Sequence, residues 1–354
     1  MGAEEVFSRT MTKKKRQRKE RARERERQQK QKLRALKQEP EEPDVPALPP
    51  DPRAMERMTA RIGRILDEQQ FESMDEAQAF LNQYLSEGGG SLEDAPAPST
   101  PLERAQELIY DAFETDDPQR RVDLAEEALQ ISEDCADAYV LLAEETTEDA
   151  GEAREFYEAG VQAGERALGE EFFTEEAGNF WGILQTRPYM RAREGLANSL
   201  WVLGERTEAL AHYRRILELN PNDNQGVRYE LAGCLLDEGL DEELGELLGQ
   251  YEDEASAFWL YTRALWRFRM EGGSERATTE LEEATATNPY VPLYLLGRKN
   301  FLAQGLPELI GLGDESEAVS YFARALTEWL KTPGAVEWLR ENTDEQLLSQ
   351  LEPE

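Results

Sequence analysis

The chain has 354 residues, a net charge of −34 at pH 7, two cysteines and one histidine. No apolar run approaches the ~18 residues of a membrane span, and no apolar stretch follows the basic N-terminus as in a secretory signal. Cys135 and Cys234 suggest neither a disulfide framework nor a metal-ligand spacing. We therefore expect a cytoplasmic protein in a reducing compartment.

The charge is unevenly spread along the chain. Residues 1–40 carry 15 Lys+Arg and 6 Asp+Glu, whereas the other residues carry 25 and 68. A body this acidic repels nucleic acid and disfavours anionic membrane surfaces. Only two lysines, Lys299 and Lys331, lie beyond residue 40. An acid-rich, lysine-poor surface also suits a salt-rich cytoplasm, so a halophilic host is a hypothesis.

The first segment, 1–53, combines a basic arm with a Pro-rich linker. Residues 11–38 are low in complexity and highly charged, which favours a largely disordered arm, or a solvated helix or coiled coil held by Arg/Glu pairs. The alternative is an arm that binds nucleic acid, the ribosome or an acidic partner. No aromatic residues interleave the charges of 11–38, so base stacking is disfavoured.

Residues 54–87 predict a small helical hairpin. Apolar residues recur at helical spacing from Met55 to Leu66, and Ser73 to Glu76 match a capping box that opens a second helix. The second helix carries Phe80 and Tyr84 on its apolar side. Residues 88–101, rich in Gly and Pro, follow as a flexible linker.

The most regular stretch is 190–223, which predicts two amphipathic helices joined by a tight turn. Gly204 ends the first helix and Asn220-Pro221 the second. Such an αα-hairpin cannot bury its apolar face alone and must stack on neighbours. Its apolar and small positions are Leu196, Ala197, Leu200 and Trp201, followed by Ala209, Leu210, Tyr213, Ile216 and Leu217.

This stretch resembles the tetratricopeptide repeat family. The matching positions are Leu196, Ala197, Gly204, Ala209, Tyr213 and Pro221. Arg193 and Ile216 depart from the family pattern, which usually has Trp and Ala there. The resemblance implies an all-α solenoid of αα-hairpins.

Further hairpins are predicted on both sides of this unit. We assign the repeat solenoid to 102–291, with residues 164–188 as an insertion whose aromatic residues pack on it. Tyr261, Ala277 and Pro289 are repeat-signature positions of the last unit. Residues 292–340 are predicted to form a helical C-terminal cap, and 341–354 an acidic tail.

A narrower resemblance covers roughly 133–338. DCADAYVLLAEE at 134–145, YMRAREGLANSLWVLGERTEAL at 189–210, and NPYVPLYLL at 288–296 followed by GDESEAVSYF at 313–322 occur in matching order. Together they look like the suppressor-of-tumorigenicity-seven family and its soluble bacterial tetratricopeptide relatives. Animal members of that family are membrane-associated. The resemblance supplies no catalytic residue to transfer to this chain.

Catalytic chemistry finds little support in the sequence. Any mechanism of the Ser/His/Asp or Cys/His kind would have to use His212, which precedes Tyr213 on a repeat helix. One histidine and two distant cysteines make no ordinary zinc site, and no calcium or dinucleotide loop is present. We therefore expect no catalytic residues, no metal and no cofactor, and favour a non-catalytic interaction scaffold or adaptor over an enzyme.

The predicted binding surface is the concave face of the solenoid. The register of tetratricopeptide first helices places the following residues there: Arg191, Asn198, Tyr229, Trp259, Arg263, Trp266 and Arg269. Arginine and tryptophan are over-represented at binding hot spots, and arginine grips carboxylates with two hydrogen bonds. We expect a protein or peptide partner, and specifically an acidic peptide. The alternative is that the tryptophans pack on the next helix.

Overall fold

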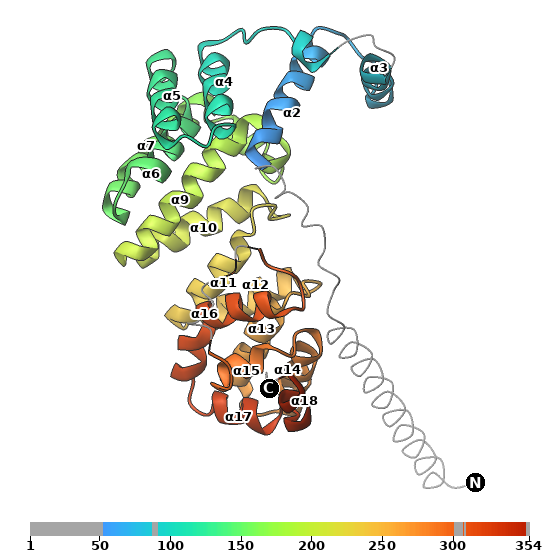
Figure 1. The fold of residues 1–354 in the computed structure, drawn as a ribbon, viewed down its shortest axis with the longest axis vertical. Coiled ribbons are helices and arrows are strands. Elements are labelled where there is room, and N and C mark those ends of the chain that lie inside the picture. The colour runs from blue at the N-terminus through green and yellow to red at the C-terminus, as the bar shows by residue number, and fades with distance from the viewer. Residues whose placement is uncertain (1–51, 87–90, 301–306, 308, 352–354) are drawn as a thin grey trace, which may run out of the picture. The chain divides into compact units, whose positions relative to one another are not determined.

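The computed structural model describes residues 52–86, 91–300, 307 and 309–351. These residues form helices joined by turns, and no strand occurs in the described ranges. The fold-class prediction of an all-α repeat solenoid is confirmed (Figure 1). The basic arm at 11–38, with its predicted disorder and its alternative role in nucleic-acid binding, lies outside the described residues.

Five consecutive helix pairs form the repeats. They are α4 (Pro101–Phe113) with α5 (Pro118–Ile131), α6 (Ala136–Thr146) with α7 (Ala150–Leu168), α9 (Arg187–Leu203) with α10 (Arg206–Leu219), α11 (Val227–Glu238) with α12 (Asp241–Gln250), and α13 (Ala257–Glu271) with α14 (Glu275–Thr287). Each pair contacts the next along the chain, so the apolar face that one hairpin leaves open is covered by its neighbour.

The central pair α9–α10 follows the sequence signals closely. Gly204 takes the left-handed conformation at the end of α9, with φ of 83°, and Asn220 ends α10. Leu196 and Ala209 are buried, as the repeat pattern predicts. Glycine also allows close packing between pairs, because a Cβ at Gly195 would lie 2.2 Å from the ring of Tyr157 on α7.

The predicted insertion interrupts the repeats between α7 and α9. It contains α8 (Phe172–Glu175), η2 (Phe180–Gly182) and η3 (Leu184–Thr186). Phe180 is fully buried, and its ring contacts those of Phe172, Phe173 and Tyr189. The aromatic residues of the insertion thus pack on the start of α9, as predicted.

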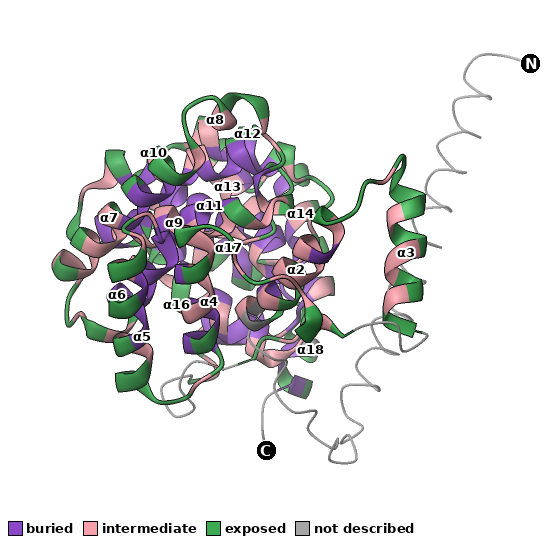
Figure 2. Ribbon diagram, turned by 90° about the horizontal axis from the view of Figure 1, so that it is seen from above, coloured by how far each residue is buried: buried purple, intermediate pink, exposed green. Residues whose placement is uncertain are grey.

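Further helices precede and follow the repeats. They are α2 (Pro52–Asp67), α3 (Met74–Ser86) and η1 (Leu92–Asp94), then α15 (Val291–Leu295), α16 (Glu315–Lys331), α17 (Ala335–Glu341) and α18 (Glu345–Leu351). α2 packs against α4, although the Gly- and Pro-rich stretch 88–101 lies between them in the sequence. α16 packs across α11 and α13. α3 contains no buried residue, and Figure 2 shows only exposed and intermediate residues along it.

Candidate functional site

Three first helices of the repeats, α4, α6 and α9, together hold α2. Arg57 of α2 pairs with Glu114, which follows the last residue of α4, at 3.0 Å, and Arg53 pairs with Glu144 of α6 at 2.9 Å. We call the residues of α4, α6 and α9 that pair with α2 the α2-binding surface. They are Glu107, Asp111, Glu114, Glu144, Arg187 and Arg191.

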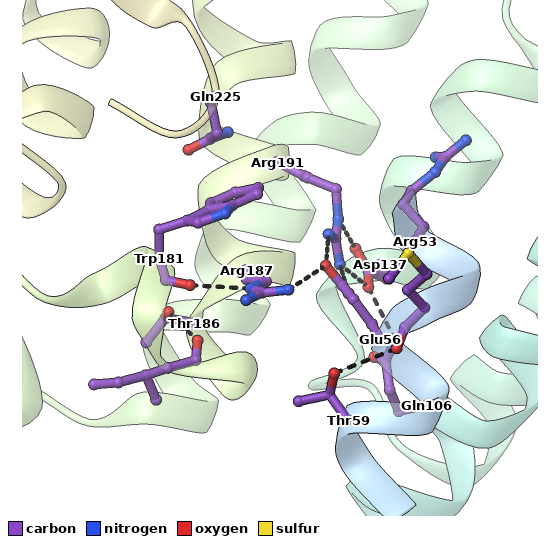
Figure 3. Close-up of polar contacts among 12 residues, drawn as sticks. Arg53, Glu56, Thr59, Gln106, Asp137, Trp181, Thr186, Arg187, Arg191 and Gln225 are labelled. Atoms are coloured by element: carbon purple, nitrogen blue, oxygen red, sulfur yellow. Dashed lines mark hydrogen bonds and ion pairs between the residues drawn. The ribbon is translucent and has the colours of Figure 1, made fainter. Parts of the chain in front are cut away.

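Arg191 is the centre of this surface. Its Nη1 donates to Glu56 of α2 at 2.8 Å, and its Nε and Nη2 donate to the two carboxylate oxygens of Asp137 on α6 at 2.9 and 2.6 Å. Figure 3 shows the guanidinium between the two carboxylates. Arg187 adds a longer contact to Glu56 at 3.3 Å. A planar guanidinium suits this arrangement because its donors form a fixed fork.

Burial makes this cluster electrostatically strong. Asp137 is fully buried and Glu56 is 4% exposed. Burial alone would lower the pKa of Arg191, but the charges of Asp137 and Glu56 outweigh burial and raise that pKa above its usual value. Gln106 of α4 donates a further hydrogen bond to Asp137 at 2.9 Å. The buried charges are thus paired and hydrogen-bonded, as such charges must be.

A cavity of about 410 Å³ lies beside α2. Its lining includes Ala60 and Gly63 of α2, Leu102, Gln106 and Tyr110 of α4, Gly164 and Ala167 of α7, and Leu184 of η3. A Cβ added at Gly63 would meet no atom within 4 Å. The face that α2 turns toward this cavity therefore leaves part of the space unfilled.

Glu194 lies one turn beyond Arg191 on α9. Burial raises its pKa to about 7, although a hydrogen bond from Gln225 opposes the shift.

The C-terminal half holds a helix in a different way. α16 lies across α11 and α13, and Arg324 of α16 forms a two-pronged pair with Glu230 of α11. Glu317 is buried and accepts hydrogen bonds from Ala257 N at 2.7 Å and from the Asn288 side chain at 2.9 Å. The Tyr321 ring packs on those of Phe258 and Tyr261.

The two tryptophans predicted for peptide binding pack within the fold. Trp259 is fully buried, beneath the rings of Tyr229 and Tyr251. Trp266 packs on Gly245 of α12 and donates to the Asp241 carbonyl at 2.8 Å. These contacts match the alternative reading, in which the tryptophans pack on neighbouring helices.

The predicted arginines are already paired. Arg263 contacts Glu283 of α14 at 2.9 Å, Arg269 contacts Asp241 of α12 at 3.1 Å, and Arg191 belongs to the cluster described above. Asn198 is exposed and accepts a hydrogen bond from Tyr213 at 2.6 Å. The structure brings Tyr229 and Trp259 into ring contact and places four of the seven residues on α13, namely Trp259, Arg263, Trp266 and Arg269.

Of the nucleophilic and basic side chains that the sequence singled out, Cys135 and Cys234 are buried and His212 is half-buried. Burial raises the pKa of Cys135 and Cys234 to about 12 and lowers that of His212 to about 4. Such thiols are protonated and unreactive at neutral pH. Within the described ranges, no group of three or more His, Cys, Asp or Glu side chains is placed to hold a metal ion.

Sequence reasoning missed Glu56 and Asp137. Asp137 had one visible signal, since it interrupts the apolar run Ala136–Ala143 where a helix should be buried. Glu56 had none, because an acidic residue between Met55 and Arg57 looks like any exposed charge.

A model of the ST7 protein family matches residues 98–351. "Suppressor of tumorigenicity 7 protein-like" from Homo sapiens is 27% identical over 261 residues, covering 68% of this chain and 45% of that protein. "Protein ST7 homolog" from Drosophila melanogaster is 27% identical over 258 residues, covering 66% and 47%. The chain thus spans about half the length of these curated relatives.

A solved structure, that of YrrB, described as a TPR protein with an unusual peptide-binding site, is 22% identical. The TM-score is 0.37, and the match covers 52% of this chain and 83% of that chain. Separately, no helix in the described part of this chain combines the length and apolar character that crossing a membrane requires.

Proposed function

The chain belongs to the ST7 protein family, and from that premise we propose that it is a cytoplasmic, non-catalytic scaffold that binds a segment of a partner protein across α4, α6 and α9. Repeat solenoids of paired helices typically present extended surfaces for other proteins. Their surfaces act by contact, so the proposal needs no catalytic residue.

The observation that carries the proposal is the position of α2. This helix precedes the repeats, yet it lies on the first helices of three different repeats and reaches Arg191 with Glu56, 135 residues away. The same surface that accepts α2 is therefore shaped and charged to accept a helical segment. Helix-in-groove binding is a recurring mode of peptide recognition.

The charge of this surface supports a different ligand from the one expected from the sequence. Four carboxylates, Glu107, Asp111, Glu114 and Glu144, face the arginines of α2, while Arg187 and Arg191 both face its Glu56. A surface with this excess of carboxylates favours a basic segment over an acidic one. Binding of a peptide by Asn198, Tyr229, Trp259, Arg263, Trp266 and Arg269 stays a prediction.

Site-specific photo-crosslinking tests the proposal. A benzophenone side chain replaces Glu144, at the exposed edge of the α2-binding surface, in the full chain, and the matched control replaces the exposed Glu126 on α5. We expect discrete products with host proteins at position 144 that an excess of a synthetic peptide of residues 52–68 suppresses. Products that are absent at 144, equal at 126, or insensitive to the peptide would contradict the proposal.

A further inference from the structure

Resting on the proposed function, we propose that α2 is an exchangeable occupant of the α2-binding surface. The segment that replaces it is a basic amphipathic helix with one carboxylate for Arg191 and a large apolar side chain where α2 has Gly63.

Charge complementarity defines the polar part of this helix. Arg57 contacts Glu107, Asp111 and Glu114 at 3.2, 2.8 and 3.0 Å. Arg64 contacts Glu107 at 2.6 Å and donates to the Pro96 carbonyl at 2.9 Å. A replacing helix needs basic side chains at these two places, because without them the carboxylates of α4 lose their partners.

The carboxylate of Glu56 is the second polar feature that a replacing helix must reproduce. Glu56 faces two arginines, and both of its oxygens accept from Arg191, at 2.8 and 3.0 Å. A basic or neutral residue at this place would leave the side of the Arg191 guanidinium that faces α2 without a carboxylate. The recognised pattern is therefore an acidic residue followed by a basic residue one and eight positions later.

Release of α2 does not leave Arg191 without a carboxylate. Arg191 makes two hydrogen bonds to Asp137, at 2.9 and 2.6 Å, that do not involve Glu56. Removing one partner of a buried pair is costly when the other charge is left uncompensated. Here the compensation lies within α6 and α9 themselves, so the surface stays formed while its occupant changes.

α2 itself is a weakly held helix. Among its described side chains, Ile65 is its one buried apolar residue, while Met55 and Met58 are 53% and 44% exposed. Gly63 in the middle of the helix costs about 1 kcal/mol relative to alanine. The ion pairs of Arg53 with Glu144 and of Arg57 with Glu114 are partly solvated and contribute little each, whereas the pair of Glu56 with Arg191 is buried.

The unfilled cavity indicates which apolar side chain would let a helix bind this surface more tightly than α2 does. Gly63 faces open space beside the 410 Å³ cavity, whose walls include Leu102, Tyr110 and Leu184. A leucine or methionine at this place would bury apolar area that α2 leaves unused. A partner helix with such a side chain therefore competes against a helix that is tethered but poorly packed.

The test uses a fluorescein-labelled peptide of residues 52–68 with Gly63→Leu, titrated by fluorescence anisotropy with three full-length proteins. They are the parent chain, the variant Arg57→Ala/Arg64→Ala, which weakens α2 and leaves the α2-binding surface intact, and the control Arg276→Ala. Arg276 is a largely exposed arginine of α14. Circular dichroism first confirms that each protein is folded.

We expect the double variant to bind the peptide about tenfold more tightly than the parent chain, because the tethered α2 competes less. The control should bind like the parent. The Gly63→Ala peptide, which has the helix propensity without the larger side chain, should bind several-fold more weakly. A peptide with Arg57→Glu and Arg64→Glu should not bind.

Each contrary result has a defined meaning. Equal affinity for the parent and the double variant would show that α2 does not compete and would overturn the exchange. Equal affinity of the Gly63→Leu and Gly63→Ala peptides would overturn the apolar requirement. Binding of the charge-reversed peptide, or no peptide binding at all, would overturn the proposed chemistry. Products of photo-crosslinking at position 144 would then decide separately whether the surface binds another kind of segment.

Discussion

α2 and α16 both lie across first helices of the repeats, yet the repeats hold them by different forces. α16 buries Glu317, Ala318, Val319, Tyr321, Ala325, Glu328 and Trp329. Among the described side chains of α2, Glu56 and Ile65 are buried. One helix is part of the core, whereas the other is attached mainly through charge. The same architecture therefore supports a permanent and an exchangeable occupant.

The two modes differ in energy for a general reason. A fully buried large apolar side chain contributes roughly 1.5–3 kcal/mol, whereas an exposed ion pair contributes about 0–1 kcal/mol. Arg57 and Arg64 of α2 are partly buried, with 18% and 16% of their side chains accessible, so their pairs lie between these two cases. Substitutions on the two helices should show this difference directly.

Trp329→Ala on α16 should have the largest effect. Trp329 is fully buried, donates its indole N–H to Tyr321 Oη at 2.8 Å and stacks on Trp338. We expect a loss of about 3–5 kcal/mol in the free energy of unfolding, measured by chemical denaturation. Met58→Ala on α2, at a half-exposed position, is the matched control and should change it by less than about 0.5 kcal/mol. Similar losses for both would erase the distinction between the helices.

Asp137→Ala and Glu56→Ala compare the two carboxylates of Arg191. Asp137→Ala should destabilise the protein by about 3 kcal/mol, because it removes the partner that is fully buried within the repeats. Glu56→Ala should cost about 1 kcal/mol, since Arg191 keeps Asp137. Thermal unfolding of both variants measures the difference. A larger loss for Glu56→Ala would mean that α2 is an integral part of the fold.

High salt should loosen α2 selectively and gives the smallest effect. At 1 M salt the Debye length falls to about 3 Å, which weakens partly exposed ion pairs but not apolar packing. Amide hydrogen exchange in α2 should therefore become several-fold faster between 0.1 and 1 M NaCl, while that in α16 should not. An isomolar series in sucrose controls for solute effects. Equal acceleration in both helices would count against an ionic attachment of α2.

Much of the fold was predictable because local signals determine it. Gly204 and Asn220 end the helices of the central repeat, and residues such as Leu196 and Ala209 recur at the spacing of a buried helix face. The placement of α2 was not predictable in the same way. A Pro- and Gly-rich stretch favours a linker, and the pairing of Arg57 with residues of α4 depends on distant parts of the chain.

The binding surface was harder to predict than the fold. The repeat register selected Trp259 and Trp266, but both pack on neighbouring helices. In this chain an arginine cannot be assumed to be available for a ligand, since 68 acidic residues beyond residue 40 supply carboxylates nearby. Arg191 was predicted to bind a peptide, and in the structure it meets Glu56 of α2 and Asp137 of α6.

The two hydrogen bonds between Arg191 and Asp137 also determine how fast exchange can proceed. In the exchange that we propose, this pair stays formed without Glu56, so a new helix meets a finished surface and needs no slow rearrangement of the repeats. The observed rate of association should then rise with ligand concentration and level off at the rate constant for departure of α2. Stopped-flow mixing would measure that plateau, and its reciprocal is the lifetime of the state in which α2 occupies its surface.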